Sequence, residues 1–404
     1  MRKGAVDTAA GPAFGHEFFR RVSMGCNLAI AGVTGAVGEE FLIKATILVC
    51  ITASFFGCTS SVSRKCENFR VVSSNFLGVV WSQGHAKASI ISQDGGFSYR
   101  IPGGSLWCFG DTFRGSRDNS GSPHLAGGAV SCATAQLGET IESLPPMLLF
   151  FTGQDGKVAQ AIDFLPAESW DRHRIWPLSG IYVNGKSYIY YSLIELTGKG
   201  MLGFKKIGSG LAYSTQPLNI HKRIQTPKGW RFPVAPRAIV MTDDWIYLFD
   251  VDKRHGRQGV WLSRVRPTEI ENPDDYQFYC GQGPSFDPDK NEEVLFLKNI
   301  YGQVSVVWNE YLNKYILASS SDLLHPCKIN FYSAENPFGP WKQACAITVP
   351  KYRQGKKVKL VYCSYFHPEL FRDNGRIMNL TFSLRLEDAG FDVNNEMVEV
   401  EVQR

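Results

Sequence analysis

One plan recurs along the chain from about residue 75: an apolar strand, a polar turn, and a second strand rich in aromatic residues. The plan is found in Ser92–Phe113, Gly180–Ser192, Ala238–Asp250, Val304–Ser320 and Pro368–Ser383. Runs of β-branched and aromatic residues bounded by Gly, Pro, Asn and Asp are typical of antiparallel hairpins. No long amphipathic pattern competes with them. The repeated hairpin therefore predicts a chain built almost wholly from strands.

Each hairpin is followed, after a variable gap, by a third strand-like run. The runs are "AVSCATAQ", "GLAYSTQ", "GVWLSRV", "KINFYSAENPFGPW" and "MVEVEVQR". A small antiparallel sheet cannot bury both of its faces alone, but copies stacked around an axis bury each other. We therefore predict an all-β fold, a five-bladed β-propeller over residues 75–404. A large β-sandwich with incidental similarity among its hairpins is the alternative.

The composition agrees with a globular protein and argues against a nucleic-acid partner. The chain has 404 residues, of which 44% are hydrophobic and 13% aromatic, so it can bury a substantial core. The formal net charge is only +5 and is spread along the sequence. The basic run Lys351–Lys359 is short, and we interpret it as a solvated loop rather than a polyanion site.

The first 65 residues form a separate region with features of an export signal. Phe41–Ser61 contains a lysine, a short apolar run and then Gly57-Cys58. The apolar run is short for a membrane span but suits the hydrophobic part of a signal peptide. The ending resembles a lipoprotein lipobox, which implies lipidation of Cys58. Arg20 and Arg21 give a second, loose twin-arginine resemblance. We expect an exported periplasmic or cell-surface lipoprotein; a cytoplasmic protein with an unusual tail is the alternative.

The cysteines do not form a metal-binding pattern. Seven of the ten follow residue 65, and none belongs to a CxxC pair, so a zinc site is not expected. Most lie in apolar strand-like runs, where cysteine acts as a small buried hydrophobe. One or two disulfides are compatible with export. We expect neither a metal nor an organic cofactor; a cation at the centre of the propeller is the alternative.

The first hairpin carries an aspartate at each end. If Pro102–Gly104 is its turn, Phe97–Ile101 pairs with Ser105–Phe109, and Asp94 and Asp111 meet at the open end. Cross-strand neighbours lie roughly 4.5–8 Å apart by Cβ, a range in which two carboxylates can flank one glycosidic bond. Repulsion between them also raises one pKa, as a general acid requires.

A structural interpretation of these two residues stays open. Asp before Gly is common in turns, and Asp before Thr can cap a strand end. Either aspartate alone is more often structural. The three neighbouring glycines favour a ligand site, because they allow the backbone to approach a bound molecule closely. They are Gly95, Gly96 and Gly110.

The segment "QDGGFSYRIPGGSLWCFGDTF" resembles the first blade of a bacterial five-bladed propeller family long classed as a domain of unknown function. That family includes endo-D-arabinanases and is similar to the arabinanase and fructosidase propellers. "IWPLSGIYVNGKSYIYYS", "VSVVWNEYLNKYILASSS" and "SYFHPELFRDNGRIMNLTFSL" resemble its second, fourth and fifth blades. The resemblance covers roughly Phe76 to Val402. It implies a glycoside hydrolase with Asp94 and Asp111 as the acidic pair.

The chain departs from the family pattern in two places. Gln93 stands where the family usually has threonine. Gly128 and Ala129 stand where Asn-Ser is expected at the start of the third strand of the first blade. A substrate-binding asparagine would then be missing, which puts the specificity in question rather than the activity.

Five further residues are candidates for substrate binding. Trp176 could stack on a sugar or pack in the core. Arg237 could bind a hydroxyl or carboxylate, or pair with a structural acid. His367 and Glu369 are expected to begin the fifth blade, where Glu369 is either a third active-site carboxylate or part of an inter-blade salt bridge. His85 could reach the site from the preceding loop or lie on the surface.

The sequence therefore predicts a monomeric glycoside hydrolase that acts on a polysaccharide or oligosaccharide, with arabinan-type furanosides as the first substrate hypothesis. Which aspartate is the acid, and whether the enzyme retains or inverts configuration, stays open at this point. A non-catalytic carbohydrate-binding propeller and a structural surface lipoprotein are the alternatives, because fold alone does not decide function.

Overall fold

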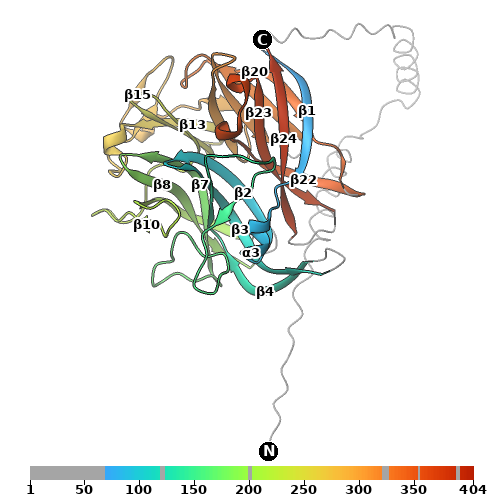
Figure 1. Ribbon diagram of the computed structural model, residues 1–404. Coiled ribbons are helices and arrows are strands. Elements are labelled where there is room, and N and C mark those ends of the chain that lie inside the picture. Colours follow the sequence, from blue (N-terminus) through green and yellow to red (C-terminus); the bar gives the residue numbers. More distant parts are fainter. Residues whose placement is uncertain (1–68, 119–122, 199–202, 321–326, 354, 388–391) are drawn as a thin grey trace, which may run out of the picture. The chain divides into compact units, whose positions relative to one another are not determined.

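The computed structural model describes residues 69–118, 123–198, 203–320, 327–353, 355–387 and 392–404. The expected export region, residues 1–65, and its candidate lipidation site Cys58 lie outside the described residues. Residues 66–404 form one compact unit. Within the described part, strands predominate and gather into five antiparallel sheets, the blades of a five-bladed β-propeller (Figure 1). The predicted fold is confirmed.

The blades are numbered in the order of the chain, and the strands of each blade are given starting with the inner strand. Blade 1 consists of β2 (Ile90–Ile101), β3 (Gly104–Arg117), β5 (Ala133–Leu137) and β6 (Leu149–Phe150), with β4 (Pro123–Val130) on the far end of β3. Blade 2 consists of β7 (His173–Val183), β8 (Lys186–Leu196), β9 (Phe204–Ser214) and β10 (Lys222–Arg223).

Blades 3 and 4 continue the series. Blade 3 consists of β11 (Pro236–Met241), β12 (Ile246–Arg254), β13 (Arg257–Val265), β14 (Gln277–Tyr279), β15 (Phe286–Asp287) and β16 (Leu297–Lys298). Blade 4 consists of β17 (Val304–Asn309), β18 (Lys314–Ser320), β19 (Lys328–Ala334) and β20 (Lys342–Thr348).

Blade 5 joins the two ends of the propeller. It consists of β22 (Lys356–Phe366), β23 (Ile377–Leu386), β24 (Val393–Gln403), β1 (Arg70–Val79) and the short β21 (Tyr352–Arg353). The N-terminal strand β1 pairs antiparallel with the C-terminal strand β24 (Figure 1). The propeller strands therefore start at Arg70, ahead of the residue 75 used for the predicted domain. This pairing covers the outer edge of the last blade, which would otherwise expose unpaired backbone groups.

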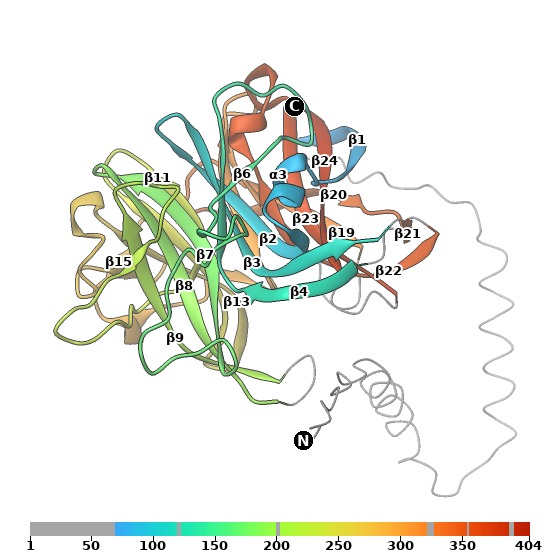
Figure 2. The ribbon, with the colours of Figure 1, turned by 60° about the horizontal axis from the view of Figure 1, so that its bottom comes forward.

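The inner strands form a closed ring around the axis. Strand β2 contacts β7 and β7 contacts β11 (Figure 2). In the same way β11 contacts β17, β17 contacts β22, and β22 returns to β2. Two of the hairpins that begin with these strands, β2–β3 and β7–β8, have two-residue turns. At the β7–β8 turn, for example, Asn184 and Gly185 have φ values of 53° and 75°. Two positive φ values in an Asn-Gly pair are the signature of a type I′ turn, whose twist matches that of the flanking strands.

The core lies between neighbouring blades rather than in one central mass. Five clusters of buried side chains fill the five interfaces. Every blade contributes a fully buried aromatic from its second or third strand. These residues are Trp107, Tyr190, Phe249, Phe331 and Phe382. The aromatic side chains predicted for the second strand of each hairpin therefore largely fill the interfaces between neighbouring blades.

The fifth hairpin differs from its prediction. The sequence pattern placed its first strand in Pro368–Ser383, but Pro368–Leu370 is a 3-10 turn, η4, and a second turn, η5 (Asp373–Gly375), precedes β23. The inner strand lies upstream, in β22. Proline at the start of "PEL" has a fixed φ and no N–H, which favours the first position of a helical turn over a strand interior.

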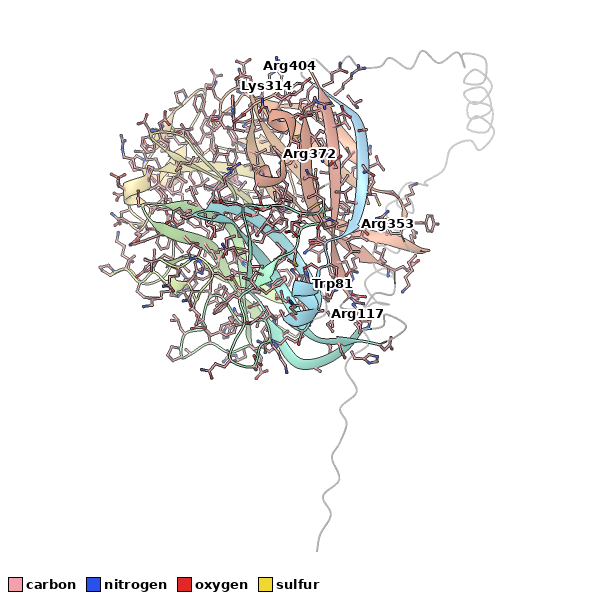
Figure 3. All side chains as sticks on the ribbon, viewed as in Figure 1. Trp81, Arg117, Lys314, Arg353, Arg372 and Arg404 are labelled. Carbon is pink, nitrogen blue, oxygen red and sulfur yellow. The ribbon has the colours of Figure 1, made fainter. Side chains whose placement is uncertain are left out.

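The remaining short elements lie outside the ring. Helix α3 (Gln83–Lys87) packs beside the outermost strand of blade 1, and η2 (Pro267–Glu269) and η3 (Lys290–Glu292) connect strands of blade 3. Beside α3, the Arg117 guanidinium lies 5.7 Å from the centre of the Trp81 ring (Figure 3). None of the helices in the described ranges is long and apolar enough to cross a membrane.

Candidate functional site

Asp94 and Asp111 lie opposite each other within the paired strands β2 and β3. The hairpin turn is Pro102-Gly103, one residue shorter than predicted, because Ile101 pairs with Gly104. The register then shifts at two bulges, so that Gly95 faces Phe109 and Gln93 faces Thr112. The prediction placed the aspartates beyond the ends of the paired strands. In the structure they lie at bulges within a longer strand pair. Bulges re-aim side chains next to active sites.

Glycine is required on both sides of this bulge. Gly95 and Gly96 have φ values of 81° and 101°, a region that other residues avoid. On the facing strand, a Cβ added to Gly110 would lie 2.4 Å from Oδ1 of Asp94. The expected close approach of a ligand stays a prediction; in the structure, the missing side chain of Gly110 lets the Asp94 carboxylate lie against the backbone of β3. The Asp111 backbone N–H donates a hydrogen bond to that carboxylate.

A residue of blade 5 forms a hydrogen bond with the Asp94 carboxylate. The Tyr362 hydroxyl donates a hydrogen bond of 3.1 Å to Oδ2 of Asp94. Tyr362 lies in β22 at a register shift, and the next residue, Cys363, has a φ of 53°. Blade 5 also braces the bulge, since the Gly95 N–H donates to the Ser383 hydroxyl at 3.0 Å. Asp94 has no cationic partner among the described residues.

Blade 2 holds Asp111 in a different environment. The Trp176 indole N–H donates to Oδ1 of Asp111 at 3.0 Å, and Nε of Arg174 lies 3.9 Å from the same oxygen. The Arg174 guanidinium stacks on the Trp170 ring, 3.4 Å from its centre. Both Arg174 and Trp176 lie in β7 two residues apart, so they share one face of that strand. Asp111 keeps 27% of its side chain exposed.

These environments separate the two carboxyl groups electrostatically. Burial, followed by repulsion from Asp111, raises the pKa of Asp94 to about 7, and the Tyr362 hydrogen bond only partly opposes this. Burial also raises the pKa of Asp111, but Arg174 and Trp176 hold it lower, at about 6. Near neutral pH, Asp94 therefore keeps its proton more readily than Asp111. A pair of unequal carboxyl groups can supply one acid and one base or nucleophile.

The structure brings Trp176 to the aspartate pair but places His367 and Glu369 elsewhere. Both residues follow β22 instead of preceding the inner strand, so they lie at the end of the ring marked by the β2–β3 turn. Fully buried His367 contacts the Ser98 hydroxyl at 2.7 Å and stacks on Trp107. Nδ1 of His367 lies 3.8 Å from Oε1 of Glu369.

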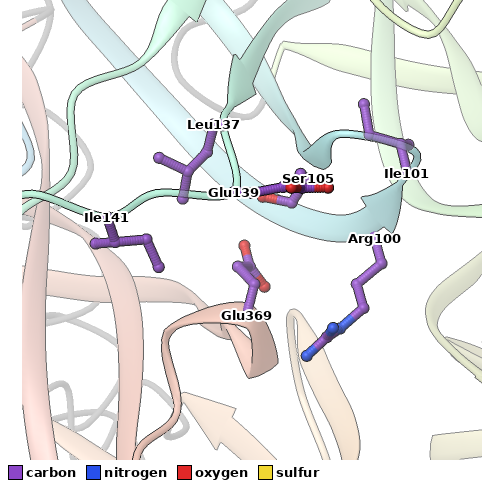
Figure 4. Close-up of a pocket in the computed structure, with 9 residues that line it drawn as sticks. Arg100, Ile101, Ser105, Leu137, Glu139, Ile141 and Glu369 are labelled. Carbon is purple, nitrogen blue, oxygen red and sulfur yellow. The ribbon is translucent and has the colours of Figure 1, made fainter.

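Two adjoining cavities occupy the axis and its far end. The axial cavity, of about 230 Å³, is lined by residues of all five inner strands, including Arg237 and Tyr365. The second cavity, of about 280 Å³, lies at the β2–β3 turn and shares Arg100 and Glu369 with the first (Figure 4). Glu369 points into it from η4 (Figure 4). Arg237 and Glu369 thus line cavities along the axis, and neither contacts the aspartates directly.

His85 lies at the outer edge of blade 1. It is 1% exposed, stacks on Trp81 and packs edge-on against Phe150, and its Nδ1 accepts a hydrogen bond from the Ser82 N–H. Burial lowers its pKa to about 3, so it stays neutral. It is therefore neither on the surface nor in contact with the aspartate pair. Its role is to attach α3 to the blade.

Sequence reasoning missed Tyr362 and Arg174. Arg174 had an available signal, because it stands two residues before Trp176 and shares its face once the strand extends upstream of the predicted hairpin, as β7 does. Tyr362 did not, since the inner strand of blade 5 was assigned to the wrong segment. The residues described by the structure include no cluster of three or more His, Cys, Asp or Glu side chains able to hold a metal ion. Cys108, Cys132 and Cys363 are buried thiols in the core.

Together, these features define a five-bladed β-propeller with a paired-carboxylate site formed by blades 5, 1 and 2. The chain belongs to the family described as "Domain of unknown function (DUF4185)", whose model matches residues 61–386. No curated protein matches this sequence.

Solved structures resemble the chain in fold. A protein from Bacteroides ovatus described as a "putative hydrolase" has a TM-score of 0.57 at 14% identity, covering 78% of this chain and 87% of its own. A family 117 glycoside hydrolase from Zobellia galactanivorans has a TM-score of 0.47 at 10% identity, covering 81% and 90%. A GH43 enzyme from Xanthomonas citri, solved with xylose, has 0.44 at 13%, covering 78% and 91%. At these identities the likeness shows the fold alone.

Proposed function

We propose that the protein is a glycoside hydrolase that cleaves a polysaccharide through Asp94 and Asp111. The observation that carries this proposal is the pair itself. Two carboxyl groups face each other across one bulged hairpin, both with raised pKa values and with different hydrogen-bond partners. A purely structural pair of acids would be expected to have counter-ions on both members, because unpaired buried charge is costly.

The two environments support separate roles. Asp94, with the higher pKa, donates its proton to the glycosidic oxygen as the bond from that oxygen to the anomeric carbon breaks. Asp111 acts as the carboxylate, either attacking the anomeric carbon or removing a proton from the water that does so. One water molecule is consumed, and its hydroxyl goes to the sugar. Its proton goes to Asp94 in the retaining route or to Asp111 in the inverting route, after which exchange with solvent restores the starting protonation. Arg174 and Trp176 keep Asp111 ionised and oriented.

The substrate class follows from the family rather than from the pair. The resemblance to a family that includes endo-D-arabinanases makes an arabinan-type furanoside polymer the first choice. On β4, Gly128 has a φ of 79°, and an added Cβ there would meet no atom within 4 Å. The open space in place of the expected asparagine is consistent with a preference that differs from that of other members.

Reducing-end release from a polysaccharide panel tests the proposal. The panel includes D-arabinan, L-arabinan and xylan, and the proteins are the wild type, Asp94→Asn, Asp111→Asn and Asp243→Asn. Asp243 lies exposed in the β11–β12 turn and serves as the matched control. We expect release by the wild type and Asp243→Asn only, with all four proteins folded. Glycan binding without release by the wild type would instead indicate a non-catalytic carbohydrate-binding propeller.

We also propose that the protein is exported and anchored through a lipid on Cys58, and that it is monomeric. The support is the lipobox-like ending of the apolar run before Cys58. Metabolic labelling with a fatty acid, in cells that express the wild type or Cys58→Ser, tests the anchor. Label on the wild type alone is the expected result, and equal labelling of both would contradict it. A monomer mass by light scattering is expected for residues 66–404.

A further inference from the structure

An exposed aromatic side chain, Phe204, contacts the Trp176 ring that is hydrogen-bonded to Asp111. Phe204, the first residue of β9, is 40% exposed. Its ring packs edge-on against Trp176, with 4.9 Å between the ring centres and 74° between the planes. Trp176 in turn donates its indole N–H to Asp111. The three residues therefore form a continuous line from the rim of blade 2 to the site.

A polar group borders this line. The Arg174 guanidinium lies flat on Trp170, and its Nη1 donates to the backbone carbonyl of His173 at 2.7 Å. Its Nε faces Asp111 at 3.9 Å. Among the described residues, Nη2 of Arg174 forms no hydrogen bond. The rim of blade 2 thus combines apolar ring surface with an oriented donor, which suits a ligand that has C–H faces and hydroxyl groups.

Single exposed aromatics are common on protein surfaces and need no explanation. Trp308 shows this well. It is 41% exposed and packs against Tyr315 with ring centres 4.9 Å apart, nearly the same arrangement as Phe204 on Trp176. Trp308 lies near the opposite end of its inner strand, however, and is not connected to the aspartates. What distinguishes Phe204 is its continuity with Asp111.

We propose that Phe204, Trp176 and Arg174 form a glycan subsite beside Asp111, which holds a neutral sugar ring of the polysaccharide next to the bond that is cleaved. The inference rests on the proposed function and deepens it. The sugar places one C–H face on the aromatic rings and a hydroxyl against the Arg174 guanidinium. Filling the subsite requires a substrate of at least two sugar residues, which a polysaccharide or oligosaccharide supplies.

Phe204→Ala tests the subsite, with Trp308→Ala as the matched control. On the polymer that the wild type hydrolyses best, Phe204→Ala is expected to raise KM by about 3- to 10-fold with little change in kcat, the loss of one stacking contact. Trp308→Ala is expected to match the wild type. Both residues are partly exposed, so both variants should fold, which thermal unfolding checks.

Binding separates failure of the subsite from failure of the proposed function. Each substitution is added to Asp94→Asn, and retardation in gels that contain D-arabinan, L-arabinan or xylan is measured. The subsite is supported if a glycan retards Asp94→Asn, if adding Phe204→Ala to it abolishes the retardation, and if adding Trp308→Ala leaves the retardation unchanged. This holds even if the wild type releases no sugar. Hydrolysis and binding unaffected by Phe204→Ala overturn the subsite and leave the hydrolase intact. No binding and no hydrolysis with any polymer overturn both.

Discussion

At the scale of single residues, the two aspartates differ only in what surrounds them. Tyr362 and a backbone N–H contact Asp94, whereas an indole and a guanidinium lie beside Asp111. A nearby cation favours the charged form of a carboxyl group, and burial without one favours the neutral form. The assignment of acid and base therefore follows from neighbours contributed by blades 5 and 2.

The pH dependence of kcat/KM reports the pKa values of the two aspartates, which these neighbours set. Activity requires ionised Asp111 and protonated Asp94, so the rate should rise through about pH 6 and fall through about pH 7. The Tyr362 hydrogen bond lowers the pKa of Asp94, so Tyr362→Phe should raise that pKa. We expect the falling limb to move up by roughly 0.5–1 pH unit, the equivalent of about one hydrogen bond. An unmoved falling limb would contradict the assignment.

Gly110 is predicted to be essential for activity but not for folding. An alanine Cβ would lie 2.4 Å from Oδ1 of Asp94 and displace the carboxylate. We expect Gly110→Ala to lower kcat by about 100-fold or more, since misplacement of a reacting group by 1 Å can cost that much. Gly281→Ala is the control, because its added Cβ meets no atom within 4 Å. Comparable loss in both variants would argue against the mechanism.

At the scale of elements, sequence reasoning was most successful where patterns are local. The runs of β-branched and aromatic residues and the turn residues between them predicted four of the five hairpins and all five third strands. The details that shape the site were not accessible in this way. The bulges beside Asp94 depend on contacts from blade 5, such as the Ser383 hydroxyl on the Gly95 N–H. These contacts join residues that are nearly three hundred positions apart in the chain.

The pairing of β1 with β24 is a second feature that local patterns did not reveal. "RVVSSNFLGV" alternates weakly, and only its partner at the other end of the chain makes it a strand. Asn75 pairs with Glu399 in this ladder, whereas Val72 falls at a register shift. Proline removes a ladder hydrogen bond in a regular pair but is tolerated at bulges.

Asn75→Pro should therefore destabilise the propeller by about 2–4 kcal/mol, and Val72→Pro by much less. Urea unfolding followed by tryptophan fluorescence measures the difference. The expected cause is loss of closure, because a displaced β1 exposes the edge of β24. Equal midpoints for the two variants would mean that β1 contributes little to ring stability.

At the scale of the whole molecule, the aspartate pair should cost stability. Both folded pKa values, about 7 and about 6, exceed the unfolded value of about 3.9. The folded state therefore binds more protons between about pH 4 and pH 7, and stability falls as the pH rises through that window. The ring tolerates this cost because five interfaces of buried side chains hold the blades together.

Asp94→Asn should reverse part of this cost. At pH 8 the variant is expected to be more stable than the wild type by about 1–2 kcal/mol, a modest gain because solvent screens a partly exposed pair. At pH 4, where most of the pair is protonated, the two proteins should unfold at nearly the same urea concentration. A variant that is less stable than the wild type at pH 8 would indicate that Asp94 is a structural residue.

The most direct measurement for the central claim compares two substrates with different leaving groups. An activated aryl glycoside of the sugar released from the polymer needs little help from an acid, whereas the polymer needs it fully. We predict that Asp94→Asn loses the polymer activity but still releases the aryl leaving group, and that Asp111→Asn loses both. If Asp94→Asn and Asp111→Asn cleave the polymer as the wild type does, the aspartate pair is not catalytic.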